Sequence, residues 1–129
     1  MIPDLGFPPL DSDHRHLLEM LEDLIRVAES SADADLLEDQ SLEVTASLES
    51  HFAKEERMLE EVQDPSRLLH AALHADLLER MARLTGAQLT ALGPLGAKDV
   101  LEAVAQDLIA EIAKFDVPAV PAILKLQKS

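Results

Sequence analysis

Apolar residues recur at intervals of three and four along separate segments of this chain, the spacing that places them on one face of an α-helix. In the clearest segment, Asp11 or Ser12 could serve as the N-cap. Its apolar stripe then consists of Leu17, Leu18, Leu21, Leu24, Ile25 and Ala28. The pattern predicts helices over roughly 11–30, 36–62, 65–86 and 98–116, with a Gly- and Pro-containing loop at about 89–97 and a short C-terminal segment.

Four amphipathic helices with short connections bury their apolar faces most simply by packing side by side. The composition agrees, because Leu, Ala and Glu dominate a chain that is 47% hydrophobic and has three Phe as its aromatic residues. A length of 129 residues suits one domain with a single core. We therefore expect an all-α protein whose residues 1–129 form one antiparallel, up-down-up-down four-helix bundle.

Charge and composition exclude several classes of protein. A formal net charge of −14 argues against binding to nucleic acid or to anionic membranes, both of which attract basic surfaces. The absence of cysteine excludes disulfides, thiolate metal sites and cysteine nucleophiles. No apolar run approaches the ~18 residues of a membrane span. The segment MIPDLGFPPLDSDH lacks the features of a signal peptide, so we expect a cytoplasmic protein with most acids on solvated helix faces.

Ionisable residues interrupt all four apolar stripes. They are His14 on the first, His51 and Glu55 on the second, His70 and His74 on the third, and Glu111 on the fourth, with Asp116 one turn later. His16 falls off the stripe and is expected to face water. A single buried histidine is usually a hydrogen-bonded core residue, but burying seven ionisable groups without a partner is too costly. Because imidazoles and carboxylates are metal ligands, their convergence predicts a metal site, and seven donors suit two ions better than one.

The pieces LDSDHRHLL (10–18), HFAKEERM (51–58), HAALH (70–74) and EIAKFD (111–116) give the chain a family resemblance. Their order and content resemble the hemerythrin family, particularly the bacterial hemerythrins and hemerythrin-like HHE cation-binding domains. The resemblance implies an antiparallel four-helix bundle around two iron ions, joined by an oxo or hydroxo bridge, that bind O2 reversibly.

The resemblance also implies a ligand set. His14 and His51 would serve one iron, and His70 and His74 the other. Glu55 and Asp116 would bridge the two ions.

Glu111 departs from the family, which has a histidine five residues before the bridging aspartate. A glutamate here leaves two alternatives open: a carboxylate-enriched site, or a site in which one iron is lost or labile. As a ligand, the carboxylate adds negative charge, which should favour ferric iron, lower the reduction potential and speed autoxidation. Oxygen ligands also suit harder ions, so manganese or zinc becomes an alternative occupant.

Three functions follow from these expectations. The first is O2 binding, for storage or sensing, with O2 or a similar diatomic or peroxide ligand entering a dry pocket that Leu17, Leu21, Leu48 and Leu77 would supply. The second is a redox enzyme that handles peroxide, nitric oxide or iron, and the third is a helical interaction module with a structural metal. No dedicated acid or base lies outside the cluster, so a binding protein is favoured over an enzyme. The sequence leaves the oligomeric state open.

Overall fold

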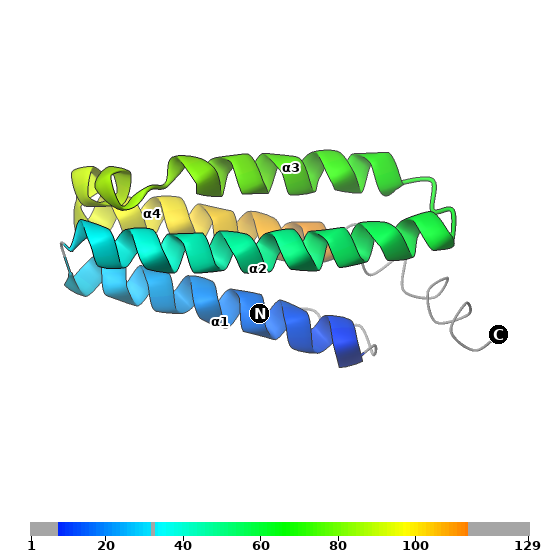
Figure 1. The fold of residues 1–129 in the computed structure, drawn as a ribbon, viewed down its shortest axis with the longest axis horizontal. Helices are drawn as coiled ribbons and strands as arrows, with labels where there is room; N and C mark the ends of the chain where they lie inside the picture. The colour runs from blue at the N-terminus through cyan, green and yellow to red at the C-terminus, as the bar shows by residue number, and fades with distance from the viewer. Residues whose placement is uncertain (1–7, 32, 114–129) are drawn as a thin grey trace.

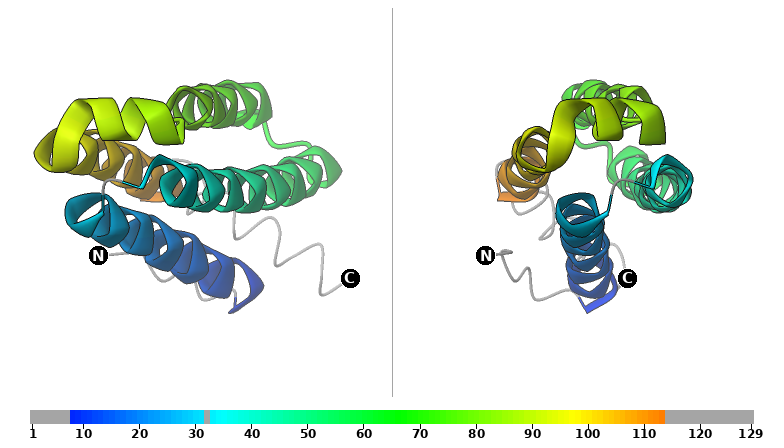
Figure 2. Two further views of the ribbon diagram at one scale, coloured as in Figure 1. Left: turned by 60° about the vertical axis from the view of Figure 1, so that its left-hand side comes forward. Right: turned by 90° about the vertical axis from the view of Figure 1, so that its left-hand side faces the viewer.

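The computed structural model describes residues 8–31 and 33–113 and folds them into four α-helices. The helices are α1 (Pro8–Ser30), α2 (Ala34–Glu61), α3 (Arg67–Arg83) and α4 (Gly86–Glu111). Successive helices run in opposite directions along the bundle (Figure 1). Each helix packs against its neighbours in the chain, and α1 also packs against α4, which closes the ring of helices (Figure 2). The predicted all-α, up-down-up-down four-helix bundle is confirmed, and the single domain over 1–129 stays a prediction.

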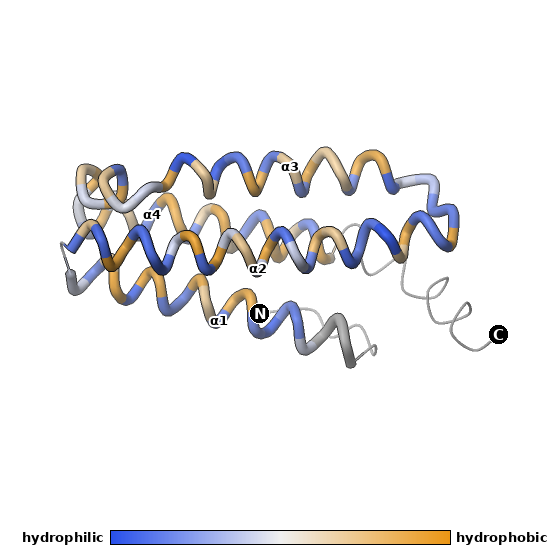
Figure 3. The backbone as a smooth tube through the Cα atoms, viewed as in Figure 1, coloured by the Kyte–Doolittle hydropathy of each residue, from blue (hydrophilic) through white to orange (hydrophobic). Residues whose placement is uncertain are grey.

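The core is aliphatic and follows the predicted stripes. Leu21 and Leu24 of α1 and Leu101 and Leu108 of α4 are completely buried, and Phe52 of α2 is nearly so. Hydrophobic and hydrophilic residues alternate along each helix with the helical repeat (Figure 3). Among the described helices, none combines the length and the apolar character that a membrane crossing requires.

The first two helices begin slightly earlier than expected. α1 starts at Pro8 and not at Asp11 or Ser12. Proline is tolerated in the first turn of a helix because the N–H that it lacks has no intrahelical partner there. α2 starts at Ala34 because the Asp33 carboxylate caps it and accepts hydrogen bonds from the backbone N–H groups of Asp35 and Leu36, at 3.1 and 3.2 Å.

The turn between α2 and α3 is longer than the sequence suggested. The third helix was expected to begin at about residue 65. Instead, the Asp64 side chain accepts a 2.8 Å hydrogen bond from the backbone N–H of Ser66, and α3 begins at Arg67. The helix ends at Arg83 and not at residue 86, because Gly86 already belongs to α4.

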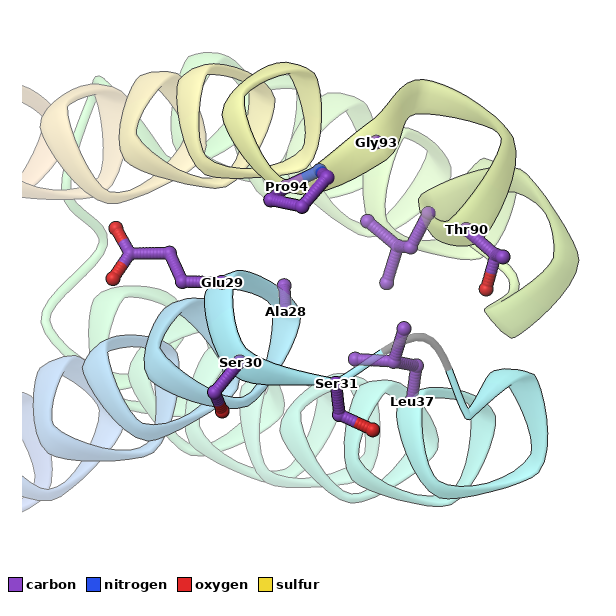
Figure 4. A pocket seen from close by; sticks show the side chains of 9 residues that line it. Ala28, Glu29, Ser30, Ser31, Leu37, Thr90, Gly93 and Pro94 are labelled. Carbon is purple, nitrogen blue, oxygen red and sulfur yellow. The ribbon is translucent and has the colours of Figure 1, made fainter.

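The expected loop at 89–97 is wrong, because α4 runs through it. Thr85 caps this helix and accepts a 3.1 Å hydrogen bond from the backbone N–H of Gln88. The helix is interrupted at Gly93, whose φ of 78° lies in the left-handed region, and Pro94 then begins its second part (Figure 4). A cavity of about 260 Å³ lies beside this kink, facing the end of α1 and the start of α2.

Candidate metal centre

Six of the seven predicted ligands meet inside one end of the bundle. Because neighbouring helices are antiparallel, the first halves of α1 and α3 lie beside the last parts of α2 and α4. The six residues are each no more than 4% exposed: His14, His51, Glu55, His70, His74 and Glu111. Their predicted inward orientation is confirmed, whereas their role as metal ligands stays a prediction. Asp116 lies outside the described residues.

The first cluster joins α1 to α2. Glu55 Oε1 lies 3.4 Å from His14 Nε2 and is also in close contact with His51 Nε2, one turn back on the same helix. The two imidazole rings meet edge to face with their centroids 4.7 Å apart. Three donor atoms, one from each residue, therefore lie close enough together to bind one ion.

The second cluster joins α3 to α4 and again includes Glu55. Glu111 Oε1 lies 3.1 Å from His70 Nδ1 and 2.8 Å from His74 Nε2. Glu55 Oε2 lies 3.8 Å from the same His74 nitrogen. Behind His74, the ring of Phe52 stacks in parallel with a centroid separation of 3.9 Å, which fixes the plane of the imidazole.

The donor atoms fit two transition-metal ions that share one carboxylate. Within each cluster the donor atoms lie within 4.8 Å of one another, and Glu55 belongs to both clusters. Imidazole and carboxylate together suit iron, manganese and zinc. Glu111 Oε2 is buried and has no hydrogen-bond partner among the described residues, although a buried carboxylate oxygen without a partner is costly. A cation beside Glu111 would remove that cost.

Burial and the neighbouring carboxylates act in opposite directions on the buried groups. Burial lowers the pKa of His51, but the carboxylates of Glu55 and Asp13 outweigh it, so the pKa is raised above 6.5. The pKa of His74 is raised in the same way, since Glu111 and other carboxylates outweigh its burial. Conversely, burial raises the pKa of Glu111, but hydrogen bonds from two histidines bring it below 4.5. The surroundings of His51, His74 and Glu111 therefore favour the charged form of each of these three groups.

Three contacting residues were missed by the sequence analysis. Asp13 Oδ2 lies 3.4 Å from His51 Nδ1 and 3.1 Å from Lys54 Nζ. Glu56 Oε2 lies 3.1 Å from His74 Nδ1. Asp13 and Glu56 were counted among the solvated acids. Both acids are chain neighbours of a predicted ligand, since Asp13 precedes His14 and Glu56 follows Glu55, but adjacency alone does not tell whether an acid reaches the next helix.

Two cavities approach the cluster from outside. One, of about 260 Å³, is lined by residues of α1 and α2 that include Asp13, His16, Lys54 and His51. The other, of about 190 Å³, lies between α3 and α4 and reaches Glu111. His16 is exposed, as predicted from its place off the apolar stripe.

The four leucines expected around a small-ligand pocket are all buried. Leu17, Leu48 and Leu77 each lie three residues from a histidine of the cluster, on the side toward the bundle centre, and Leu21 lies one turn further in. The cluster is therefore bordered on its inner side by aliphatic side chains.

Comparison with known proteins finds a relative of the expected kind. The chain is 33% identical over 79 residues to Bacteriohemerythrin from Stenotrophomonas maltophilia (strain R551-3). The match covers 61% of this chain and 51% of that protein, so the chain spans about half the length of the curated relative. No protein-family model matches the chain, and no solved structure matches it significantly. The resemblance to hemerythrins is confirmed, and with the buried clusters it supports a hemerythrin-like metal-binding protein.

Proposed function

We propose that this chain holds two transition-metal ions, most favourably iron, and that it binds O2 or a similar small ligand there. The observation that supports this proposal best is that Glu55 belongs to both donor clusters. In the proposal His14 and His51 hold one ion, while His70, His74 and Glu111 hold the other, with Glu55 as a bridge. Asp116, outside the described residues, is the second proposed bridge.

Bound iron would supply a redox-active centre that can take O2 or peroxide as a ligand. The protein's own part is to position the donors and to exclude water. Leu17, Leu48 and Leu77 are 2%, 1% and 3% exposed and sit one turn inward from the proposed ligands, so they keep that side of the site dry. A dry surrounding strengthens every electrostatic interaction inside it.

Glu111 supports a second candidate function, a redox enzyme on the same scaffold that acts on peroxide, nitric oxide or iron. Its buried carboxylate contacts both His70 and His74, where the resemblance implies a histidine as third donor. An additional negative charge favours the more oxidised metal, which weakens reversible O2 binding and favours electron transfer.

Metal content tests the first part of the proposal. The metal-free chain is titrated anaerobically with Fe²⁺, and bound iron is determined by elemental analysis after gel filtration. About two equivalents per chain are expected, because the structure offers two donor clusters. Binding of less than about half an equivalent of any transition metal would contradict the proposal.

Exposure of the iron-loaded chain to O2 then separates the candidate functions. A charge-transfer absorption band that appears with O2 and disappears on its removal would support O2 binding. A rapid, irreversible change, accelerated by peroxide, would support the redox enzyme. No change in spectrum with iron bound would leave a structural metal and contradict both.

A further inference from the structure

Two of the buried histidines have a carboxylate at each ring nitrogen. His51 Nε2 faces Glu55 inside the bundle, while its Nδ1 faces Asp13. His74 Nε2 faces Glu111, while its Nδ1 faces Glu56. In both rings Nε2 points toward the donor cluster and Nδ1 points out of it. The outer carboxylates have no place in the ligand set proposed above.

We infer that Asp13 and Glu56 are positioning residues, which accept the Nδ1–H of His51 and His74 and so direct each Nε2 lone pair at the metal. This inference rests on the proposed function, because it concerns residues that would act on the metal through its ligands. A neutral imidazole has one donor nitrogen and one acceptor nitrogen, so fixing the proton on Nδ1 leaves Nε2 free to ligate. A carboxylate acceptor also makes the ligating nitrogen more basic.

Asp13 is held in place by a second contact. Lys54 lies three residues after His51 on α2, and its Nζ is 3.1 Å from the same Asp13 oxygen that faces the imidazole. The side chains of Asp13 and Lys54 are 36% and 39% exposed, and they line the cavity of about 260 Å³ beside His51. Asp13 therefore lies at the boundary between solvent and the buried cluster.

Glu56 acts on a ring that is already fixed on another side. Stacking on Phe52 sets the plane of the His74 ring. The ring can then still flip by a half-turn about its χ2 bond, which exchanges the positions of its nitrogen and carbon atoms. The contact of 3.1 Å between Glu56 Oε2 and His74 Nδ1 favours the edge that leaves Nε2 toward Glu111. The Glu56 side chain is 40% exposed, so it too lies at the surface of the cluster.

The geometry of antiparallel helices explains why both acids are chain neighbours of a proposed ligand. Consecutive residues are about 100° apart around a helix, so the neighbour of an inward residue faces an adjacent helix. Asp13 precedes His14 on α1, and Glu56 follows Glu55 on α2, which runs the opposite way. Because the direction is reversed, one step back on α1 and one step forward on α2 turn in the same sense around the bundle. Asp13 thus reaches α2, and Glu56 reaches α3.

The test uses the zinc-loaded, ¹⁵N-labelled chain, because Zn²⁺ is diamagnetic and accepts imidazole ligands. Imidazole ¹⁵N shifts identify the metal-bound nitrogen, and the remaining ring N–H proton reports its hydrogen bond. In the wild type His51 and His74 should ligate through Nε2 and show protected Nδ1–H protons. Asp13→Ala should shift the Nδ1–H resonance of His51 and speed the exchange of that proton with water, without affecting His74. Glu56→Ala should have the same effect on the Nδ1–H of His74 alone.

The affinity for Zn²⁺, measured by competition with a chelator, should fall about 10–100-fold in each variant, the usual effect of losing such a partner. Glu22→Ala on α1 and Glu49→Ala on α2 are matched controls, because both remove an exposed acid from the same helix, and both should bind Zn²⁺ like the wild type. Asp13→Asn and Glu56→Gln keep an oxygen that can accept the Nδ1–H, so they should recover most of the affinity.

The possible failures are distinguishable. Wild-type protein that takes up no Zn²⁺ and no Fe²⁺ would overturn the proposed function and this inference together. Zinc bound through Nδ1 of either ring, or Nδ1–H protons unchanged in the alanine variants, would overturn the inference alone. Circular dichroism shows whether each alanine variant folds. If one does not, Asp13→Asn or Glu56→Gln is used in its place, and loss of zinc binding through Nε2 in that variant would contradict the inference.

Discussion

At the scale of single residues, the charge of Glu111 is central to the proposed redox character of the site. Glu111→His should raise the reduction potential of the iron-loaded chain, because it removes one negative charge beside His70 and His74. Spectroelectrochemical titration would measure the change. Asp99→His is the control, since it makes the same substitution at an exposed position on α4. An unchanged or lower potential in Glu111→His would contradict the argument even if the metal is still bound.

The two histidines near the start of α1 should differ in their effect on metal content. His14 is completely buried against Glu55, whereas His16 is exposed. His14→Ala should therefore lower the bound metal toward one equivalent per chain, and His16→Ala should leave it at the wild-type level. Elemental analysis of both variants after identical loading provides the comparison. Equal loss in the two variants would show that the donor set on α1 has been assigned incorrectly.

The helical repeat was sufficient to predict which ionisable residues point inward. His14 and Glu111 could be recognised because each replaces an apolar residue on an otherwise apolar stripe. Asp13 and Glu56 could not, because a partly exposed acid on a helix is usually solvated. Whether such an acid reaches the next helix depends on how each helix is rotated in the bundle, and a single sequence does not contain that information.

At the scale of helices, α4 shows why the loop expected at 89–97 was wrong. Glycine and proline usually end a helix, and Gly93 and Pro94 do interrupt this one. The interruption is confined to one backbone position because Pro94 suits the first turn of the following segment. Leu89 before the kink and Ala97 after it are both 1% exposed, so burial keeps both segments on the bundle. Tertiary packing has outweighed the local signal.

Gly86 at the start of α4 is held against α2 by close packing. A Cβ atom at this position would lie 1.9 Å from the backbone oxygen of Ala34, which cannot move aside as a flexible side chain can. Gly86→Ala should lower the free energy of unfolding by about 1–3 kcal/mol or more, the usual cost of overpacking. Denaturant unfolding would measure it.

Gly96→Ala is the matched control for that substitution. Gly96 lies within α4, and its nearest neighbour would be the Cβ of Leu92 at 3.2 Å. At 3.2 Å Leu92 has to shift by only a few tenths of an ångström, and alanine favours helix, so the change in stability should stay within about 1 kcal/mol. A loss as large as that of Gly86→Ala would refute the explanation from close packing.

At the scale of the whole molecule, the buried cluster connects all four helices, so the proposed metal should stabilise the entire bundle. A ligand that binds only the folded state raises the free energy of unfolding by about 4 kcal/mol when present at about 1,000 times its Kd. Removing the metal with a chelator should lower Tm, and re-adding Fe²⁺ or Zn²⁺ should restore it. The same Tm with and without a metal known to be bound would mean that the donors do not hold the helices together.

Without metal, the stability of the bundle should depend on pH through the same buried groups. The pKa values of His51 and His74 are raised above 6.5 by the carboxylates around them. Their contribution to the free energy of unfolding is therefore complete below pH 6.5 and is lost as the pH rises through the raised values. Glu111 has a pKa below 4.5, so its contribution is present above pH 4.5 and is lost as the pH falls through the lowered value. The metal-free chain should therefore be most stable between these limits.

Urea unfolding of the metal-free chain at about pH 5.5 and about pH 8.5 would test the expected decrease at the higher pH. A net charge of −14 could produce a decrease by general repulsion, so His74→Gln is needed as a control. His74 is faced by Glu55 and Glu56 of α2, Glu111 of α4 and the ring of His70, and removing its titration should reduce the pH dependence of stability.

The zinc-loaded chain should instead become more stable as the pH rises, since the metal requires unprotonated imidazoles and gains affinity at higher pH. A metal-free chain that is more stable at the higher pH would contradict the charge arrangement described for the cluster.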